Sequence, residues 1–388
     1  MRALRFHEHG RPADVLRLDT VPTPEPGPGE VRIRLTHRTV NPADLSLVRG
    51  TYGRSRELPA VGGNEGTGRV DAVGAGVEGL AVGDRVVKLG EAPTWQEAVV
   101  VAAEDALPVP DALPDEAAAQ LFVNPLTAWL LLRAAPLDAG DALVLTAGAS
   151  AVARITTELA VREGVRVVSV VRRPDHADRL RALGARPVVA DANKAEARAA
   201  LREAVGEGGA AAVFDPVAGG AGALALATLG EGGVHVVYGA LSGEPLAVPP
   251  AALIYRDVTV RGVWRTQWAA RTPRAEVRAT LSDLPGLAAE APSGSRWTPA
   301  TTWPMAPTPP ARRPYLVGGE RSSSSARPAS AGSSPAVPSS SGSSSDAMIP
   351  ESTSSSTRAI RLPTAWWSVI MTATSAPPTS APTPVTTK

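Results

Sequence analysis

The chain has 388 residues, no cysteine and a formal net charge of +1, and 44% of its residues are hydrophobic. This length suggests two or more domains with a sizeable core. The absence of cysteine excludes disulfides, thiolate metal sites and a cysteine nucleophile. The balanced charge gives no support for a nucleic-acid or membrane-surface partner. We expect a cytoplasmic protein, because the chain shows no charged leader and no apolar run of about 18 residues.

Residues 1–115 consist of short alternating runs separated by glycine and proline. The runs that predict strands are MRALRFHEHG, VRIRLTHRTV, GTGRVDAVGA, DRVVKLG and QEAVVVA. The segment VPTPEPGPGE predicts a connector between two of them. Together these runs are typical of a mostly β domain.

Residues 116–255 alternate between strand and helix patterns. The predicted strands are ALVLTAG, VRVVSVVRR, PVVA, AAVFDP and GGVHVVYGA. The predicted helices are SAVARITTELAVREG, HADRLRALGA and KAEARAALREAVG, with a further Ala/Leu-rich helix after AAVFDP. Such alternation with short connections predicts a parallel sheet covered by helices on both faces.

The last third of the chain changes character. Residues 256–291 return to strand in DVTVRGVW and helix in RAEVRATLSDLPGLAAE, and we expect them to lead back to the β domain. In residues 292–388 serine, threonine and proline dominate, and we interpret this tail as disordered or as translated from a shifted reading frame. The frameshift is favoured, since RWTPATTW and TAWWSV carry tryptophans that linkers rarely contain.

Several separated motifs occur together and in order. They are VNPADLSLVRGTYG (40–53), LPAVGGNEGTGRV (58–70), VNPLTAW (123–129), VVRRP (170–174), VVYGALSG (236–243) and YRDVTVRGVWRTQW (255–268). In these motifs the chain resembles the mitochondrial-type trans-2-enoyl-thioester reductases, a zinc-free branch of the medium-chain dehydrogenase/reductase superfamily. The resemblance covers about residues 1–290 and implies an α/β protein with a GroES-like, β-rich catalytic domain and a doubly wound Rossmann domain. It also implies a homodimer that transfers hydride from NADPH to the β-carbon of an acyl thioester of coenzyme A or acyl carrier protein.

Tyr52 matches the catalytic tyrosine of the resembled family. Hydride addition at the β-carbon of an enoyl thioester produces an enolate. A phenol can donate a hydrogen bond to that oxygen or supply the proton at the α-carbon. The alternative is a loop tyrosine whose hydroxyl is in water.

Asn41 and Asn64 stand where the zinc alcohol dehydrogenases of this superfamily have a cysteine and a histidine ligand. Neutral amides are poor zinc ligands, and the chain's histidines show no ligand spacing. We therefore expect no metal and assign both asparagines to the substrate pocket.

The turn in ALVLTAGASAVAR follows a predicted strand and precedes a helix, as in a dinucleotide-binding loop. The residues expected to face the pyrophosphate are Gly148, Ala149, Ser150, Ala151 and Val152. Alanine replaces the family's usual glycine at residues 151 and 153, so an ordinary small-residue loop is the alternative.

Arg172 and Arg173 end the second strand of this region, where NAD enzymes carry an acidic residue. Cationic side chains there suit the 2′-phosphate of NADPH, although a solvated arginine pair is the alternative. By resemblance, Asn124, Thr127, Tyr238 and Gly239 also contact the cofactor, while Trp264 and Trp268 line the substrate pocket. For Asn124, Tyr238 and the tryptophans, structural roles in helix starts or in core packing are equally consistent with the pattern.

The predicted function is NADPH-dependent reduction of a 2-enoyl thioester. The first alternative is an NADPH:quinone reductase of the sister branch, which does not need a phenol at Tyr52. The second is an inactive or misfolded family member, because the Ser/Pro tail replaces the segment that completes the catalytic domain in the family.

Overall fold

The computed structural model describes residues 1–190 and 195–282. In this part of the chain the strands form two antiparallel sheets and one parallel sheet. The mixed α/β fold class predicted from the sequence is therefore confirmed. The tail (292–388) and the end of the predicted return segment lie outside the described residues.

The first antiparallel sheet has the strand order β2-β1-β4, and the second has the order β7-β3-β5-β6-β8. The strands are β1 (Arg2–Phe6), β2 (Leu16–Thr20), β3 (Glu30–Arg38), β4 (Ala60–Val61), β5 (Gly66–Val73), β6 (Arg85–Lys88), β7 (Ala98–Ala102) and β8 (Ala106–Pro108). The short helical elements of this region are α1 (Pro12–Val15), α2 (Pro42–Arg49), η1 (Ala103–Asp105) and α3 (Asp115–Ala118).

Strand β3 shows why the alternating runs form half-buried strands. Val31, Ile33 and Leu35 are buried with Val70 of β5, while Arg32 and Arg34 point to the other face. There both arginines are ion-paired with Asp71 at 2.7 and 2.9 Å. A period of two in the sequence thus becomes one apolar and one charged face.

The parallel sheet has six strands in the order β11-β10-β9-β12-β13-β14. They are β9 (Ala142–Leu145), β10 (Arg166–Val171), β11 (Arg186–Val189), β12 (Ala210–Asp215), β13 (Leu229–Val237) and β14 (Thr259–Gly262). This order is that of the doubly wound dinucleotide-binding fold. In such a sheet, ligands bind where the order reverses, which is here beside the carboxyl ends of β9 and β12.

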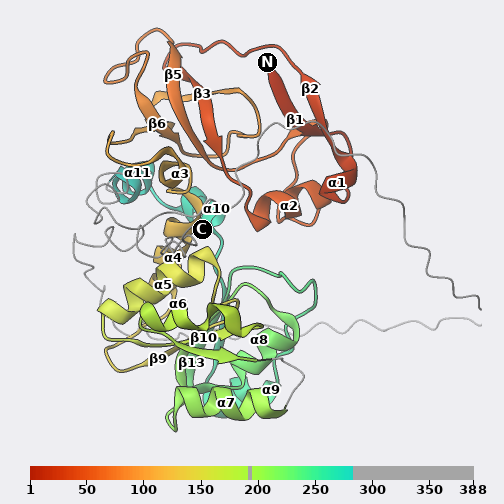
Figure 1. Cartoon of the computed structure of the whole chain (residues 1–388), viewed down its shortest axis with the longest axis vertical. Helices are drawn as coiled ribbons and strands as arrows, with labels where there is room; N and C mark the ends of the chain where they lie inside the picture. Colours follow the sequence, from red (N-terminus) through yellow and green to blue (C-terminus); the bar gives the residue numbers. More distant parts are fainter. Residues whose placement is uncertain (191–194, 283–388) are drawn as a thin grey trace, which may run out of the picture. The chain divides into compact units, whose positions relative to one another are not determined.

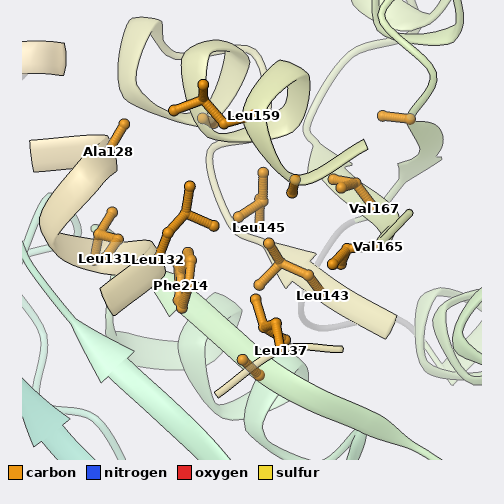
Figure 2. Close-up of a cluster of buried hydrophobic side chains, with 14 of the residues drawn as sticks. Ala128, Leu131, Leu132, Leu137, Leu143, Leu145, Leu159, Val165, Val167 and Phe214 are labelled. Atoms are coloured by element: carbon orange, nitrogen blue, oxygen red, sulfur yellow. The ribbon is translucent and has the colours of Figure 1, made fainter. Parts of the chain in front are cut away.

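Helices cover both faces of the parallel sheet, with α4 and α5 on one side and α7 and α9 on the other (Figure 1). They are α4 (Val123–Ala134), α5 (Ala151–Arg162), α6 (Ala177–Ala182), α7 (Ala195–Val205), α8 (Gly219–Leu226) and α9 (Pro250–Arg256). Figure 2 shows Leu143, Leu145 and Phe214 of the sheet facing Leu131 and Leu159 of the helices. The other residues of β9, Ala142 and Val144, belong to the core on the opposite face. A strand buried on both faces needs a continuous apolar run, as ALVL is.

The segment after residue 255 first contributes a strand to the parallel sheet and then continues as two helices. Strand β14 pairs in parallel with β13, so the sheet extends past the boundary expected at residue 255. Helices α10 (Arg265–Arg271) and α11 (Arg274–Ser282) follow, and α10 packs against α4. The expected domain boundaries themselves stay predictions. None of the helices in the described residues has the length and apolar character that crossing a bilayer requires.

Candidate active site

Tyr52 lies in the loop that follows α2. The helix ends at Gly50, whose φ of 75° is in the left-handed region that glycine adopts without strain. The Tyr52 ring meets the Trp264 ring edge-on, with centroids 5.9 Å apart, and the indole Nε1 donates a hydrogen bond of 3.0 Å to the Tyr52 hydroxyl. Because an indole N–H can only donate, the phenol oxygen is the acceptor here. Among the residues that the structure describes, no hydrogen bond is donated by the Tyr52 hydroxyl, so its hydrogen is available for a ligand there.

Glu65 is a buried carboxylate that no pattern in the sequence indicated as functional. Its Oε1 accepts from the Thr39 hydroxyl at 3.2 Å and from Asn41 Nδ2 at 2.9 Å. Its Oε2 accepts from the backbone N–H of Phe122 at 3.2 Å and of Val123 at 2.7 Å, at the start of α4. Burial raises the pKa of Glu65, and the donated hydrogen bonds oppose that rise. The carboxylate joins the β-rich region to the first turn of α4.

A second buried network contains both predicted asparagines. Asn64 Nδ2 donates to Asp44 Oδ1 at 2.6 Å, and the Asn41 backbone N–H donates to Asp44 Oδ2 at 2.6 Å. Lys88, fully buried, donates to the carbonyls of Asn64, Gly90 and Ala92 at 2.9, 2.8 and 2.5 Å. Burial raises the pKa of Asp44 to about 7 and lowers that of Lys88 to about 7. The amide groups of Asn41 and Asn64 are thus engaged within the protein, and their assignment to the substrate pocket stays a prediction.

Within the described residues, no group of three His, Cys, Asp or Glu side chains is placed to hold a metal ion. Asn41 and Asn64 instead belong to the hydrogen-bonded network that contains Asp44 and Lys88. Lys88 lies in the predicted strand DRVVKLG, and no feature of that run indicated that the lysine would be buried.

A cavity of about 390 Å³ is lined in part by Arg265, the residue that follows Trp264 in the chain. Its apolar lining residues are Leu89, Phe122, Leu126, Trp268 and Val277, and its charged lining residues are Arg265, Glu91, Glu104 and Asp105. Trp268, predicted to line the pocket, packs edge-on against Trp129 with ring centroids 5.7 Å apart. The two predicted pocket tryptophans are therefore placed differently: Trp264 contacts Tyr52, whereas Trp268 lines the cavity.

The predicted phosphate-binding turn lies at the carboxyl end of β9, beside β10. Gly148 donates its backbone N–H to Val170 at 2.9 Å, and a β-carbon at Gly148 would come within 2.6 Å of the Ser169 side chain. Glycine is therefore required by the close approach to β10. Ser150 is the N-cap of α5 and accepts from the Ala153 N–H at 3.3 Å. Ala149, Ala151 and Val152 are partly exposed at the amino end of this helix.

Asp215, at the end of β12, is hydrogen-bonded to Thr146, which lies just before this turn. Its carboxylate accepts from the Thr146 hydroxyl at 2.5 Å, from His235 Nε2 at 3.1 Å and from the Val217 N–H at 2.8 Å. Asp215 and His235 are fully buried. Burial alone would raise the pKa of Asp215, but these hydrogen bonds hold it below its usual value. The network joins β9, β12 and β13 at the edge where the sheet order reverses.

The remaining predicted cofactor residues surround the same edge. Tyr238 follows β13 and its hydroxyl is hydrogen-bonded to the Ser150 side chain, while burial raises its pKa. A β-carbon at Gly239 would come within 2.8 Å of the Pro216 carbonyl, so glycine is needed there too. Arg172 and Arg173 are exposed after β10, with Arg173 3.4 Å from Asp175.

Asn124 and Thr127 lie on the first turns of α4, partly exposed, and the Thr127 hydroxyl donates to the Val123 carbonyl at 2.6 Å. They are on the helix whose start is held by Glu65. The structure thus groups the predicted cofactor residues around α5 and α4, and the predicted catalytic residue with Trp264. Their roles stay predictions.

Comparisons with known proteins agree with this arrangement. Residues 27–111 match the family model of the alcohol dehydrogenase GroES-like domain, and residues 151–283 match that of the zinc-binding dehydrogenases. The human mitochondrial enoyl-[acyl-carrier-protein] reductase is 34% identical over 276 residues, covering 69% of this chain and 73% of that protein.

Solved structures with the same fold include a mycobacterial protein complexed with NADPH. It is 33% identical, has a TM-score of 0.66, and the match covers 77% of this chain and 93% of that one. Quinone oxidoreductase of Escherichia coli complexed with NADPH is 25% identical, with a TM-score of 0.67 and coverage of 74% and 88%. The chain therefore belongs to the enoyl-thioester reductases of the medium-chain dehydrogenase/reductase superfamily, a family of oxidoreductases related to the quinone reductases.

Proposed function

We propose that the protein uses NADPH to reduce the carbon–carbon double bond of a trans-2-enoyl thioester. The observation that carries this proposal is the hydrogen bond from Trp264 Nε1 to the Tyr52 hydroxyl, which leaves the phenol hydrogen free to donate. The names of the relatives support the choice of substrate class, because the human relative is an enoyl-[acyl-carrier-protein] reductase.

The role of Tyr52 follows from where charge develops in this reaction. When bound, NADPH supplies a hydride to the β-carbon of the enoyl group, and negative charge then accumulates on the thioester oxygen. Tyr52 donates its hydroxyl hydrogen toward that oxygen or gives its proton to the α-carbon. Trp264 holds the phenol in place and polarises it, because a hydroxyl that accepts a hydrogen bond becomes a better donor.

The residues at the carboxyl edge of the parallel sheet fit NADPH. Helix α5 directs its amino end, capped by Ser150, toward the turn at Gly148, and such ends favour phosphate groups. Arg172 and Arg173 are exposed at the end of β10, where a 2′-phosphate is expected in this fold. We assign the pyrophosphate to Gly148–Val152 and the 2′-phosphate to the two arginines.

The substrate pocket is assigned to the cavity lined by Trp268. Its volume of about 390 Å³ falls within the range of small-molecule sites, and its walls at Leu126 and Trp268 are apolar. We place the acyl chain of the substrate there, with the thioester near Tyr52. Coenzyme A and acyl carrier protein both remain candidates for the thiol part.

We also propose that catalysis needs no metal and that the protein acts in the cytoplasm. Neutral amides at Asn41 and Asn64, both engaged by Asp44 or Glu65, support the first point. Dialysis against a strong chelator is therefore expected to leave activity unchanged, and loss of activity that zinc restores would contradict it.

The second candidate is an NADPH:quinone reductase, which the similarity to the Escherichia coli quinone oxidoreductase favours. The two activities differ in their need for Tyr52. Reduction of a quinone does not require a phenol at this position, whereas reduction of an enoyl thioester uses it as the donor.

The test follows NADPH absorbance with crotonyl-CoA or hexenoyl-CoA, and in parallel with a quinone, for the full-length protein and the Tyr52→Phe variant. Oxidation with the enoyl-CoA, reduced roughly 100-fold or more in the variant, supports the proposal. Turnover of quinone alone, unaffected by the substitution, favours the second candidate. A folded protein without either activity supports the remaining alternative, an inactive member of the family.

A further inference from the structure

Glu91, between β6 and β7, contacts both of the segments that carry Tyr52 and Trp264. Its Oε2 is ion-paired with Arg54, two residues after Tyr52 in the loop that joins α2 to β4. Its Oε1 accepts a hydrogen bond of 3.3 Å from the hydroxyl of Thr266, two residues after Trp264 in α10. One carboxylate therefore connects the loop that carries Tyr52 to the helix that follows Trp264.

Two cationic side chains fix the backbone around Glu91. The Glu91 carbonyl accepts a hydrogen bond of 3.1 Å from Arg56 Nη2. The buried Lys88 Nζ donates to the carbonyls on either side, those of Gly90 at 2.8 Å and Ala92 at 2.5 Å. Because the main chain is held before, at and after Glu91, its carboxylate is presented from a fixed point, as a group that positions another side chain requires.

The contact between Tyr52 and Trp264 depends on such a connection. Tyr52 lies in a loop and Trp264 is the N-cap of α10, so neither residue is part of a sheet. The loop approaches the indole closely, since a β-carbon at Gly53 would be 3.4 Å from the Trp264 ring. The length of the hydrogen bond from Trp264 Nε1 to the Tyr52 hydroxyl, 3.0 Å, therefore follows from how the loop and α10 are held together.

We propose that Glu91 is a positioning residue for the reaction, which holds the loop of Tyr52 against α10 and so keeps the phenol on the Trp264 indole. The inference rests on the proposed function, because it concerns the placement of the same phenol. A misplacement of about 1 Å in a reacting group can cost about 100-fold in rate. The ion pair with Arg54, whose two side chains are 36% and 38% exposed, contributes little to stability. Glu91 is therefore expected to affect kcat far more than folding.

Steady-state kinetics with crotonyl-CoA and NADPH test this role in Glu91→Gln, which keeps the shape of the side chain and removes its charge. We expect kcat to fall about tenfold, with KM for either substrate changing less than about twofold. Glu91→Asp keeps the charge and should recover part of kcat. Glu97→Gln is the matched control, because that carboxylate is also partly exposed and ion-paired with an arginine, Arg2, and it should keep kcat.

The Tyr52→Phe background separates positioning from a general structural role. Once the phenol hydroxyl is gone there is no donor left to position, so adding Glu91→Gln should lower the residual kcat less than about twofold. Thr266→Val removes one of the two connections and should lower kcat by a smaller factor than Glu91→Gln. A tenfold loss that persists in the Tyr52→Phe background would overturn the inference. A raised KM for crotonyl-CoA with unchanged kcat would overturn it too, because Glu91 also lines the cavity and would then bind substrate.

Nuclear magnetic resonance of nitrogen-labelled tryptophan indoles reads the same geometry without turnover. The Trp264 Nε1–H signal is identified by its loss in Trp264→Phe. We expect its exchange with solvent to be about fivefold faster in Glu91→Gln and unchanged in Glu97→Gln, since the loop then separates from α10 more often. Unchanged exchange in Glu91→Gln would contradict the inference, whether or not the protein reduces crotonyl-CoA. Faster exchange in a protein that reduces no enoyl thioester would support the connection by Glu91 and contradict the proposed function alone.

Discussion

Tyr52 and Trp264 are 212 residues apart in the chain, yet their side chains form one hydrogen-bonded unit. The motif around GTYG predicted Tyr52, and the motif GVWRTQW predicted Trp264 as a pocket aromatic. That the indole donates to the phenol could not be predicted, because the contact depends on how α10 and the loop after α2 meet. In the proposed mechanism, Trp264 would act on the reaction through Tyr52, which would make it a positioning residue.

Trp264→Phe tests this positioning role at the scale of one hydrogen bond. The ring contact with Tyr52 is largely kept, but the donor is lost, so we expect kcat for the enoyl thioester to fall about tenfold with little change in KM for NADPH. Steady-state kinetics measure both constants. Trp129→Phe, in the other tryptophan pair, is the control and keeps kcat. A fully active Trp264→Phe variant would remove Trp264 from the mechanism.

Ala218 illustrates a residue whose conformation no sequence pattern indicated. Its φ of 59° and ψ of −153° lie in a region that glycine alone adopts without strain. We expect Ala218→Gly to raise the free energy of unfolding by about 1 kcal/mol, as measured by urea denaturation. Ala227→Gly, at a φ of −65°, is the matched control and lowers that free energy, since only the entropy of glycine is added. Equal effects of the two substitutions would argue against strain at Ala218.

At the scale of elements, the strands were predictable where one face is buried and helices were predictable where they are amphipathic. The run VRIRLTHRTV became β3, and KAEARAALREAVG became α7 apart from its ends. Helix α4 was not assigned, because its buried residues, which include Pro125, Leu126 and Leu130–Leu132, leave no regular polar face. Helix α2 was read only as part of a motif, since it is short and begins with Asn-Pro.

Asp215 joins three strands of the parallel sheet, and its pKa links that junction to pH. The folded-state pKa is lowered, so the carboxylate stabilises the fold above the unfolded value of about 4, and this contribution is lost as pH falls through the folded value. We expect Asp215→Asn to lower the free energy of unfolding by about 2 kcal/mol at pH 7. The difference from the unsubstituted protein should shrink below about pH 4.

Urea denaturation of both proteins at pH 7, 5 and 3.5 measures this difference directly. Asp178→Asn is the control, because that carboxylate is fully exposed and, among the residues that the structure describes, ion-paired only with Arg181 one helical turn away. The substitution should therefore change stability little at any pH. If Asp215→Asn lowers the free energy of unfolding as much at pH 3.5 as at pH 7, the charge of Asp215 does not stabilise the junction of the three strands. His235, fully buried against Asp215, is the partner whose replacement should have a similar effect.

At the scale of the whole molecule, the described strands of the parallel sheet leave two edges that differ in their surroundings. Strand β14 forms one edge, and the preceding helix α9 exposes Ile254 at 68% and Tyr255 at 80%. Strand β11 forms the other edge, with Val189 exposed at 48%. An open strand next to large apolar side chains is suited to pairing with a second chain.

We therefore propose that two copies of the protein pair through β14 about a twofold axis, which would continue the sheet across the interface. Sedimentation of the full-length protein should give a dimer, and Ile254→Glu combined with Tyr255→Glu should dissociate it, because burying two carboxylates in the interface is costly. Val189→Glu, at the opposite edge, should leave the dimer intact. Dissociation by Val189→Glu alone would move the interface to β11, and a monomeric unsubstituted protein would leave both edges unpaired.

Since Tyr52 and Trp264 come from the same chain, the monomeric double variant should still reduce the enoyl thioester, which separates assembly from catalysis.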